Sequence, residues 1–259
     1  EVDPSFASID IDNYTPFSSS GQVRPMEATQ VLRAAQVGGM FDERLEAATY
    51  ALLLGEGIHP GPWVGAEIGL VEQAGDLEFV KGTHELFAMK ATNQFEQVDA
   101  PSTNRFLDVR RGTFHELDPR GTVLHEGAFE YIVPSSFSTN TVACLPTFRS
   151  KGRIYVGLEK RAFAALEVKK GGCLMPTTTA WRLPKDVATP DDAVAFMKRH
   201  LASEFGLESG KVWPLGGKYY TSVGVTPELV YPHAVEVSPD AARASTLEWV
   251  DLGDLVKHR

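Results

Sequence analysis

The sequence predicts an α/β fold in which short strands accompany one well-marked helix. Three observations indicate this. Apolar runs of strand length, separated by turns rich in Gly and Pro, recur from residue 105 onward. The stretch 189–206 carries both the start and the stop signals of a helix. Residues 25–54 place apolar side chains at helical spacing, whereas residues 1–24 show no period and are expected to be a tail.

The length, composition and net charge of the chain limit the classes of protein to which it can belong. The chain has 259 residues, 43% of them hydrophobic, which suits one large domain or a smaller domain with a long extension. A net charge of −9 argues against general nucleic-acid binding, because that function uses clustered cations, although a local patch at Lys169 and Lys170 stays open. Neither a membrane-length apolar run nor a signal peptide is visible.

The number and setting of the cysteines indicate in which cellular compartment the protein is expected. Cys144 and Cys173 are too few for a disulfide framework, and Cys144 lies in an apolar run that predicts a buried thiol. We therefore expect a reducing, intracellular setting, that is, a cytoplasmic protein.

The predicted central helix has clear ends. Thr189 is placed to cap its N-terminus, and Pro190 fits the first helical position. Asp191 and Asp192 follow where the helix dipole favours negative charge, and Gly206 supplies the left-handed stop. Apolar side chains at helical spacing predict the buried stripe, namely Val194, Met197 and Leu201. The polar residues His200, Ser203 and Glu204 are three and four apart and therefore share one face.

Other elements follow from local patterns. Helices are expected across 28–35 and 42–54, an extended segment across 84–90, and a linker at 101–104. Short strands are predicted at 106–110, 113–116, 121–125 and 129–133, then a hairpin from 139–148 and 153–158. Beyond the helix, strands are expected near Tyr219 and across 229–237, and a closing strand and helix at 247–255.

The stretch 185–207 resembles the Nudix box, whose pattern is G-x5-E-x7-R-E-U-x-E-E-x-G-U with U apolar. The matching positions are Asp191 (for Glu), Arg199, Leu201, Glu204, Gly206 and Leu207. Three positions depart from the pattern, namely Lys185 for Gly, His200 for Glu and Ser203 for Glu. In that family, carboxylates at the positions of His200, Ser203 and Glu204 hold a divalent cation, so this chain keeps one of three.

The resemblance extends over roughly 105–255. Trp181-Arg-Leu-Pro is similar to the Trp-Glu-Leu-Pro of the ADP-ribose pyrophosphatase branch, with Arg182 in place of a further metal-site Glu. The segment 219–228 resembles that branch's Tyr-x-Ser-Pro-Gly-x-x-x-Glu loop, and Trp249-Val-Asp-Leu its closing strand. The strands of 105–135 look like its N-terminal β extension, which often builds a dimer. The implied fold is a Nudix-like sandwich with a mixed sheet between helices over 105–259, preceded by an N-terminal extension over 1–104.

Two functions follow from this resemblance. The first is a protein that has lost hydrolysis and binds a nucleotide ligand or serves as an interaction subunit of an assembly, without a cofactor. The second is an active hydrolase that cleaves a nucleoside diphosphate linked to another group, such as ADP-ribose, with Mg²⁺ or Mn²⁺. A purely structural role is a third. The expected partners are a nucleoside diphosphate, other proteins, or a second copy bound through the β extension. Membrane binding is not expected.

The resemblance also assigns roles to residues. Glu204 would be the remaining metal ligand, and Glu204 and Glu228 would be catalytic in an active enzyme. The expected ligand-binding residues are Arg182, Tyr220 and Ser222. Asp191 and Arg199 are expected to form a salt bridge, with Gly206 ending the helix. Open alternatives are loop capping by Glu228, a softer metal bound by His200 and Glu204 without a visible third ligand, and core packing of Trp181 and Tyr220.

Overall fold

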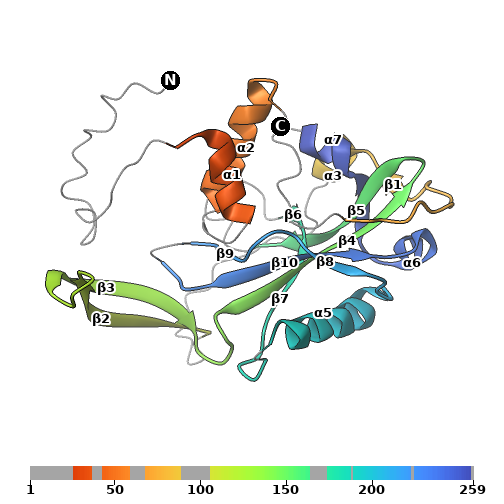
Figure 1. Ribbon diagram of the computed structural model, residues 1–259. Coiled ribbons are helices and arrows are strands. Elements are labelled where there is room, and N and C mark those ends of the chain that lie inside the picture. Colours follow the sequence, from red (N-terminus) through yellow and green to blue (C-terminus); the bar gives the residue numbers. More distant parts are fainter. Residues whose placement is uncertain are drawn as a thin grey trace.

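The chain forms a mixed α/β structure with a large mixed sheet (Figure 1). In this computed structural model the described residues are 26–36, 43–58, 68–88, 106–163, 174–187, 189–222 and 225–257. The predicted N-terminal tail and the predicted linker at 101–104 lie outside them. Among the described residues, no helix is long and apolar enough to cross a membrane.

The main sheet has nine strands and is built around β4 (Asn140–Ser150). Antiparallel to β4 runs β5 (Arg153–Ala162), which confirms the predicted hairpin, and parallel to it runs β10 (Leu229–Glu236). The path is completed by β1 (Val80–Lys81), β11 (Glu248–Asp251) and β8 (Val212–Pro214) in the order β1-β11-β5-β4-β10-β8. Three short strands pair beside it, namely β6 (Leu174–Thr177) on β5, β7 (Thr179–Arg182) on β4 and β9 (Tyr219–Tyr220) on β10.

One face of the sheet is covered by α5 (Pro190–Phe205), the predicted central helix. The Thr189 hydroxyl accepts a hydrogen bond from the Asp192 N–H, and Gly206 has a φ of 68°, so both predicted ends are confirmed. Met197 and Leu201 are fully buried, and Ala193 nearly so. The stacked rings of Phe148 and Tyr155 lie in the same core, beside Trp249 and the short helix α6 (Pro239–Ala244).

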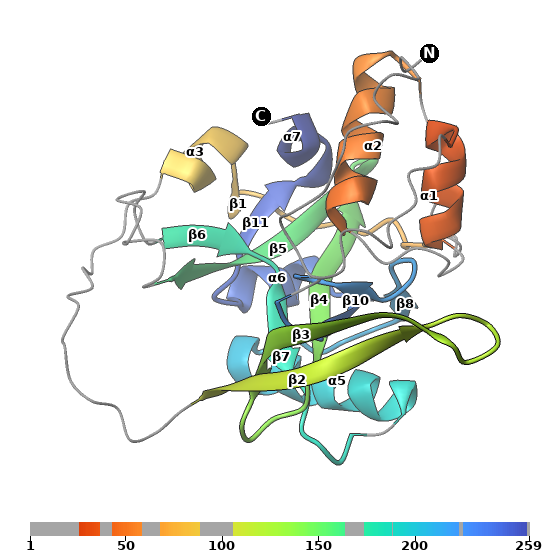
Figure 2. The ribbon, with the colours of Figure 1, turned by 90° about the vertical axis from the view of Figure 1, so that its left-hand side faces the viewer.

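The opposite face carries α3 (Thr83–Ala88) and α7 (Leu252–Lys257) (Figure 2). The prediction of an extended segment at 84–90 was wrong, because residues 83–88 form a helix. Thr83 and Leu86, three residues apart, are its buried side chains, and this spacing suits a helix. Leu86 packs with Val156, Leu158 and Val250 of the sheet. Since β1 also pairs with β11, residues 80–88 belong structurally to the main sheet. The domain boundary at 104/105 stays a prediction.

The two N-terminal helices were predicted correctly. They are α1 (Ala28–Gln36) and α2 (Glu43–Gly55), which pack together on the α7 side of the sheet (Figures 1 and 2). Leu32 of α1 and Leu53 of α2 are buried.

A two-stranded ribbon projects beside the main sheet and consists of β2 (Leu107–Leu117) and β3 (Val123–Pro134) (Figures 1 and 2). The strands predicted at 106–110 and 113–116 are one strand, because Gly112 continues β2 opposite Phe129. An added Cβ at Gly112 would lie 3.3 Å from the Phe114 ring, so the glycine makes room for an aromatic cluster. The predicted turn at 118–121 is confirmed, with the Asp118 carboxylate accepting the N–H groups of Arg120 and Thr122.

Candidate functional site

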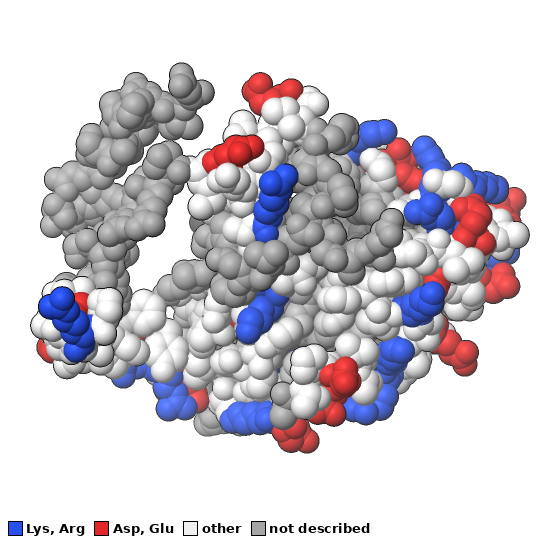
Figure 3. Space-filling view, viewed as in Figure 1, with Lys and Arg blue, Asp and Glu red and all other residues white. Residues whose placement is uncertain are grey.

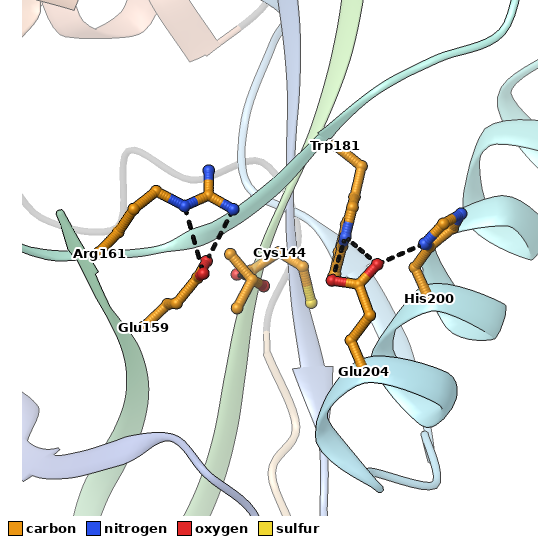
Figure 4. A network of polar contacts seen from close by, with 7 residues as sticks. Cys144, Glu159, Arg161, Trp181, His200 and Glu204 are labelled. Carbon is orange, nitrogen blue, oxygen red and sulfur yellow. Dashed lines mark hydrogen bonds and ion pairs between the residues drawn. The ribbon is translucent and has the colours of Figure 1, made fainter. Parts of the chain in front are cut away.

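The candidate site lies beside the C-terminal half of α5, where Glu204 faces strand β7 (Figure 4). The Trp181 indole N–H donates to both carboxylate oxygens of Glu204, at 3.0 and 3.1 Å. The His200 Nδ1 donates to one of the same oxygens at 2.6 Å from the preceding helical turn. Nitrogen donors therefore already occupy the carboxylate that the motif assigns to a cation.

The three side chains form one packed unit. The Trp181 ring lies 5.7 Å from the His200 ring and 6.3 Å from the Phe205 ring, measured between centroids. Phe196 packs against the other side of His200 at 4.3 Å. Trp181 is therefore packed against α5, which agrees with the core-packing alternative for this residue.

Glu204 is an ionised group. Burial pushes its pKa upward, but the hydrogen bonds from His200 and Trp181, together with the charges of His200 and Arg161, outweigh that effect and leave the pKa below its ordinary value. A carboxylate of this kind accepts hydrogen bonds at neutral pH and is not poised to donate a proton.

A second carboxylate in the same neighbourhood is Glu159 on β5, a residue that the sequence did not single out (Figure 4). The Arg161 guanidinium holds it with two contacts of 3.2 Å, one from Nε and one from a terminal nitrogen. The alternation of β5 places both side chains on the same face of the strand. Each negative charge here thus faces a nitrogen donor.

Glu228 belongs to a separate network around Arg182, which follows Trp181 on β7 and therefore points to the opposite face of the strand. Its carboxylate accepts from the Arg182 guanidinium at 3.0 Å, from the Thr141 hydroxyl at 2.6 Å and from the Thr221 hydroxyl at 3.3 Å. Arg182 also donates to the Ser138 carbonyl oxygen. The loop that begins at Tyr219 is thereby fixed to β4 and β7, which agrees with a capping role for Glu228.

The two other expected ligand-binding residues lie on this loop. The Ser222 carbonyl accepts the N–H groups of Val225 and Thr226 and so forms a turn. Tyr220 pairs with Leu229 as part of β9 and is 36% exposed. Ser222 and Glu228 thus lie on one loop, which Arg182 of β7 contacts through Glu228, whereas the hydrogen-bond partners of Glu204 come from α5 and from Trp181.

The expected ion pair between Asp191 and Arg199 is wrong. Both residues lie within α5, eight positions apart, so about 12 Å of helix rise separates them. Both are exposed, and the Arg199 guanidinium lies 6.0 Å from the centre of the Phe196 ring. Gly206 does end the helix as predicted.

The residues around Glu204 do not fit the divalent cation that the motif implies. Mg²⁺ and Mn²⁺ require clustered oxygen ligands, whereas Glu204 is surrounded by the Trp181 N–H, the His200 ring and the Arg161 charge. Ser203, at another ligand position, turns its hydroxyl back to the His200 carbonyl oxygen. Within the described ranges no three His, Cys, Asp or Glu side chains form a metal-binding group.

Cys144 lies near these residues but is fully buried on β4 (Figure 4). Burial raises the pKa of its thiol to about 12, so the thiolate needed for nucleophilic attack does not form at neutral pH. The prediction of a small buried side chain is confirmed.

No protein-family model matches this sequence, and no curated protein is significantly similar to it.

Proposed function

We propose that this protein is a Nudix-like protein without hydrolytic activity that acts as an interaction subunit, with the β2–β3 ribbon as its contact surface. The main support for the loss of hydrolysis is the set of hydrogen bonds that the Glu204 carboxylate accepts. Both oxygens of this carboxylate accept from Trp181, and His200 bonds one of them, so a cation would have to displace two donors. Glu228, which would activate water in an enzyme, is held by Arg182.

The ribbon supports the interaction role because it exposes apolar side chains at high density. The large apolar residues of the ribbon and its flanks that are at least 42% exposed are Phe106, Leu107, Val109, Phe114, Leu117, Val123, Leu124 and Phe137. The turn end of the ribbon lies at the left edge of Figure 3, where uncharged residues (white) surround a few charged ones (blue and red). A two-stranded sheet of this kind is only marginally stable alone in water, so a partner surface would stabilise it.

The edge of the ribbon indicates what partner would fit. β2 has no second neighbour among the described strands, whereas the Ile132 N–H of β3 donates a hydrogen bond to the Val225 carbonyl oxygen. A strand of 11 residues whose outer edge has no partner among the described strands can pair with another strand through its backbone. Two copies related by a two-fold axis would join their β2 strands antiparallel into one four-stranded sheet.

Charges along the ribbon do not oppose this pairing. Arg111 forms an ion pair with Glu130 across the strands, and the His115 ring is hydrogen-bonded to Glu126 at 2.6 Å. The ribbon therefore presents a surface of mixed charge to a second copy.

The experiment is a measurement of assembly. Sedimentation velocity of the wild-type protein is expected to give a dimer, and Val109→Lys a monomer, because Val109 is 67% exposed and a charge there meets the partner strand. Val71→Lys is the matched control, since Val71 is 57% exposed but lies outside the ribbon. A wild-type monomer, or a Val109→Lys protein that still assembles, would contradict the role of the ribbon.

Nucleotide binding without hydrolysis is the second candidate. It is favoured by the half-exposed Arg161, whose guanidinium lies close enough to lower the pKa of Glu204 and could meet a phosphate. A calorimetric screen of nucleoside diphosphates with and without Mg²⁺ tests it. Binding that needs the metal would instead support the hydrolase alternative with ADP-ribose as the model substrate.

A further inference from the structure

A second site lies at the opposite end of α5 from Glu204. It is a cavity of about 210 Å³ between the first turn of α5, strand β10 and the segment 214–218. Ala193 lines it, and the 11 residues from there to Glu204 correspond to about 16 Å of helix rise. The cavity is therefore separate from the candidate site described above.

The cavity lies beside the first half of β10. Side chains alternate along a strand, so Tyr231, His233 and Val235 lie on one face of β10. Val235 is fully buried in the core with α5, whereas Tyr231 and His233 are only half-buried and line the cavity. The segment 214–218 forms the remaining wall, turning at Gly216 with a φ of 73°.

Most of the wall is apolar. The apolar residues that line it include Leu183, Val187, Pro190, Pro214 and Pro232. A dry apolar cavity of about 150 Å³ admits benzene, so this one has room for a single aromatic ring with a polar substituent. Prolines and short aliphatic side chains are rigid, which keeps the space open and suits a flat ring.

Five polar side chains complete the lining, namely those of Asn140, Thr189, Lys218, Tyr231 and His233, and the Thr189 hydroxyl is bonded to Asp192 as the cap of α5. His233 donates its Nδ1–H to the Tyr231 carbonyl oxygen at 3.0 Å, which leaves Nε2 as an acceptor. Burial lowers the pKa of His233, so the ring is neutral at physiological pH. The side chains of Asn140, Lys218 and Tyr231 have no hydrogen-bond or ion-pair partner within the described residues.

The charged residues of the lining indicate the sign of the charge that a ligand would carry. Lys218 is the charged residue among those that line the cavity, which include no Asp or Glu. The acids of the first turn, Asp191 and Asp192, are exposed and outside the lining, and the Asp192 carboxylate accepts from the Thr189 hydroxyl at 2.6 Å. A negative substituent would therefore pair with Lys218, and a donor on the ring would meet the acceptor nitrogen of His233.

We propose that this cavity binds a single-ring aromatic carboxylate that also carries a hydroxyl group, with its carboxylate on Lys218, its ring between the proline and aliphatic walls, and its hydroxyl on His233.

The test is a calorimetric titration of the full chain with 4-hydroxybenzoate. Saturable binding at one site is expected, with a Kd below about 1 mM, and the thermal midpoint should rise because the ligand binds the native state. The neutral analogue 4-hydroxybenzamide should bind more weakly, since it lacks the charge that pairs with Lys218. Absence of saturable binding by the wild-type protein would overturn the proposal.

Two lysine variants locate the site. Lys218→Met should weaken 4-hydroxybenzoate binding by about tenfold or more, as expected for loss of a charged hydrogen bond. The same variant should bind the benzoate and the benzamide equally. Lys211→Met, which changes an exposed lysine outside the lining, should leave the affinity unchanged. Equal affinity of wild type and Lys218→Met would show that the ligand does not bind in this cavity.

Discussion

Trp181 and Glu204 are joined by a bifurcated hydrogen bond, in which one indole N–H reaches both carboxylate oxygens at 3.0 and 3.1 Å. The donor comes from strand β7 and the acceptor from α5, so the bond fixes the helix to the sheet. The carboxylate that the Nudix resemblance would assign to a cation is thus bonded here to a neighbouring strand.

Removal of the indole donor should loosen the contact. Trp181→Phe keeps an aromatic ring but leaves Glu204 with His200 alone, and we expect a loss of about 1 kcal/mol in the free energy of unfolding. The pKa of Glu204 should rise in the variant, which NMR titration measures. Trp213→Phe is the control, because no hydrogen bond of its indole to another described residue is seen. An unchanged Glu204 pKa in Trp181→Phe would contradict the bond.

The charge of Glu204 should make stability depend on pH. Because its folded-state pKa lies below the ordinary value of 4.5, the carboxylate stabilises the native state fully above that value and loses this contribution as the pH falls through the lowered pKa. Glu204→Gln should therefore be less stable than wild type at pH 7, by less than about 1 kcal/mol since the side chain is 42% exposed. The difference should vanish in acid.

The free energies of unfolding of wild type and Glu204→Gln, measured with denaturant at a series of pH values, test this expectation. Glu208→Gln is the matched control, because Glu208 is exposed and its side chain makes no hydrogen bond or ion pair with another described residue. A Glu204→Gln difference that grew as the pH was lowered would refute the assignment.

Arg182 and Glu228 should be energetically coupled. Both side chains are mostly buried, at 24% and 20% exposure, so removal of one partner leaves the other poorly solvated. In a double-mutant cycle of Arg182→Met and Glu228→Gln, the coupling free energy should be about 0.5–3 kcal/mol. The more exposed pair Arg161 and Glu159 gives the comparison, with coupling of at most about 1 kcal/mol. Equal coupling in the two cycles would mean that burial does not strengthen the Arg182–Glu228 pair.

Asp191 and Arg199 should behave independently. Asp191→Ala removes a charge that favours the helix N-terminus, at about 0.3–1 kcal/mol, and Arg199→Ala should change stability little. The double variant should equal the sum of the two within about 0.5 kcal/mol. The cap Thr189→Ala should cost more than Arg199→Ala, about 1 kcal/mol. A coupling free energy well above about 0.5 kcal/mol would show that the two side chains do interact.

Local signals determined which elements could be predicted. The ends of α5 followed from Thr189 and Gly206, because caps act on the adjacent backbone. The helix α3 was missed because its six residues carry little period of their own, and burial of Leu86 on the sheet decides their conformation. The strand break expected at Gly112 was wrong for a similar reason, since the packing of the Phe114 ring against Phe129 and Tyr131 across the ribbon sets the role of that glycine.

The site was harder to predict because its contacts are long-range. Glu228 lies 46 residues from Arg182 and 87 from Thr141, so their bonding has no local signature. Glu159 was missed because a charged residue in a strand usually faces solvent. The Asp191–Arg199 pair was inferred from the motif, whereas the helix that contains both residues keeps them apart.

The most direct measurement is a magnesium titration combined with an ADP-ribose hydrolysis assay on the wild-type protein. The bonding of Glu204 by Trp181 and His200 predicts no saturable rise in thermal midpoint with magnesium and no cleavage above background, because a ligand shifts the midpoint only if it binds the native state. A stabilisation that saturates at micromolar magnesium, together with turnover of roughly 1 per second or more, would contradict the account and identify an active hydrolase.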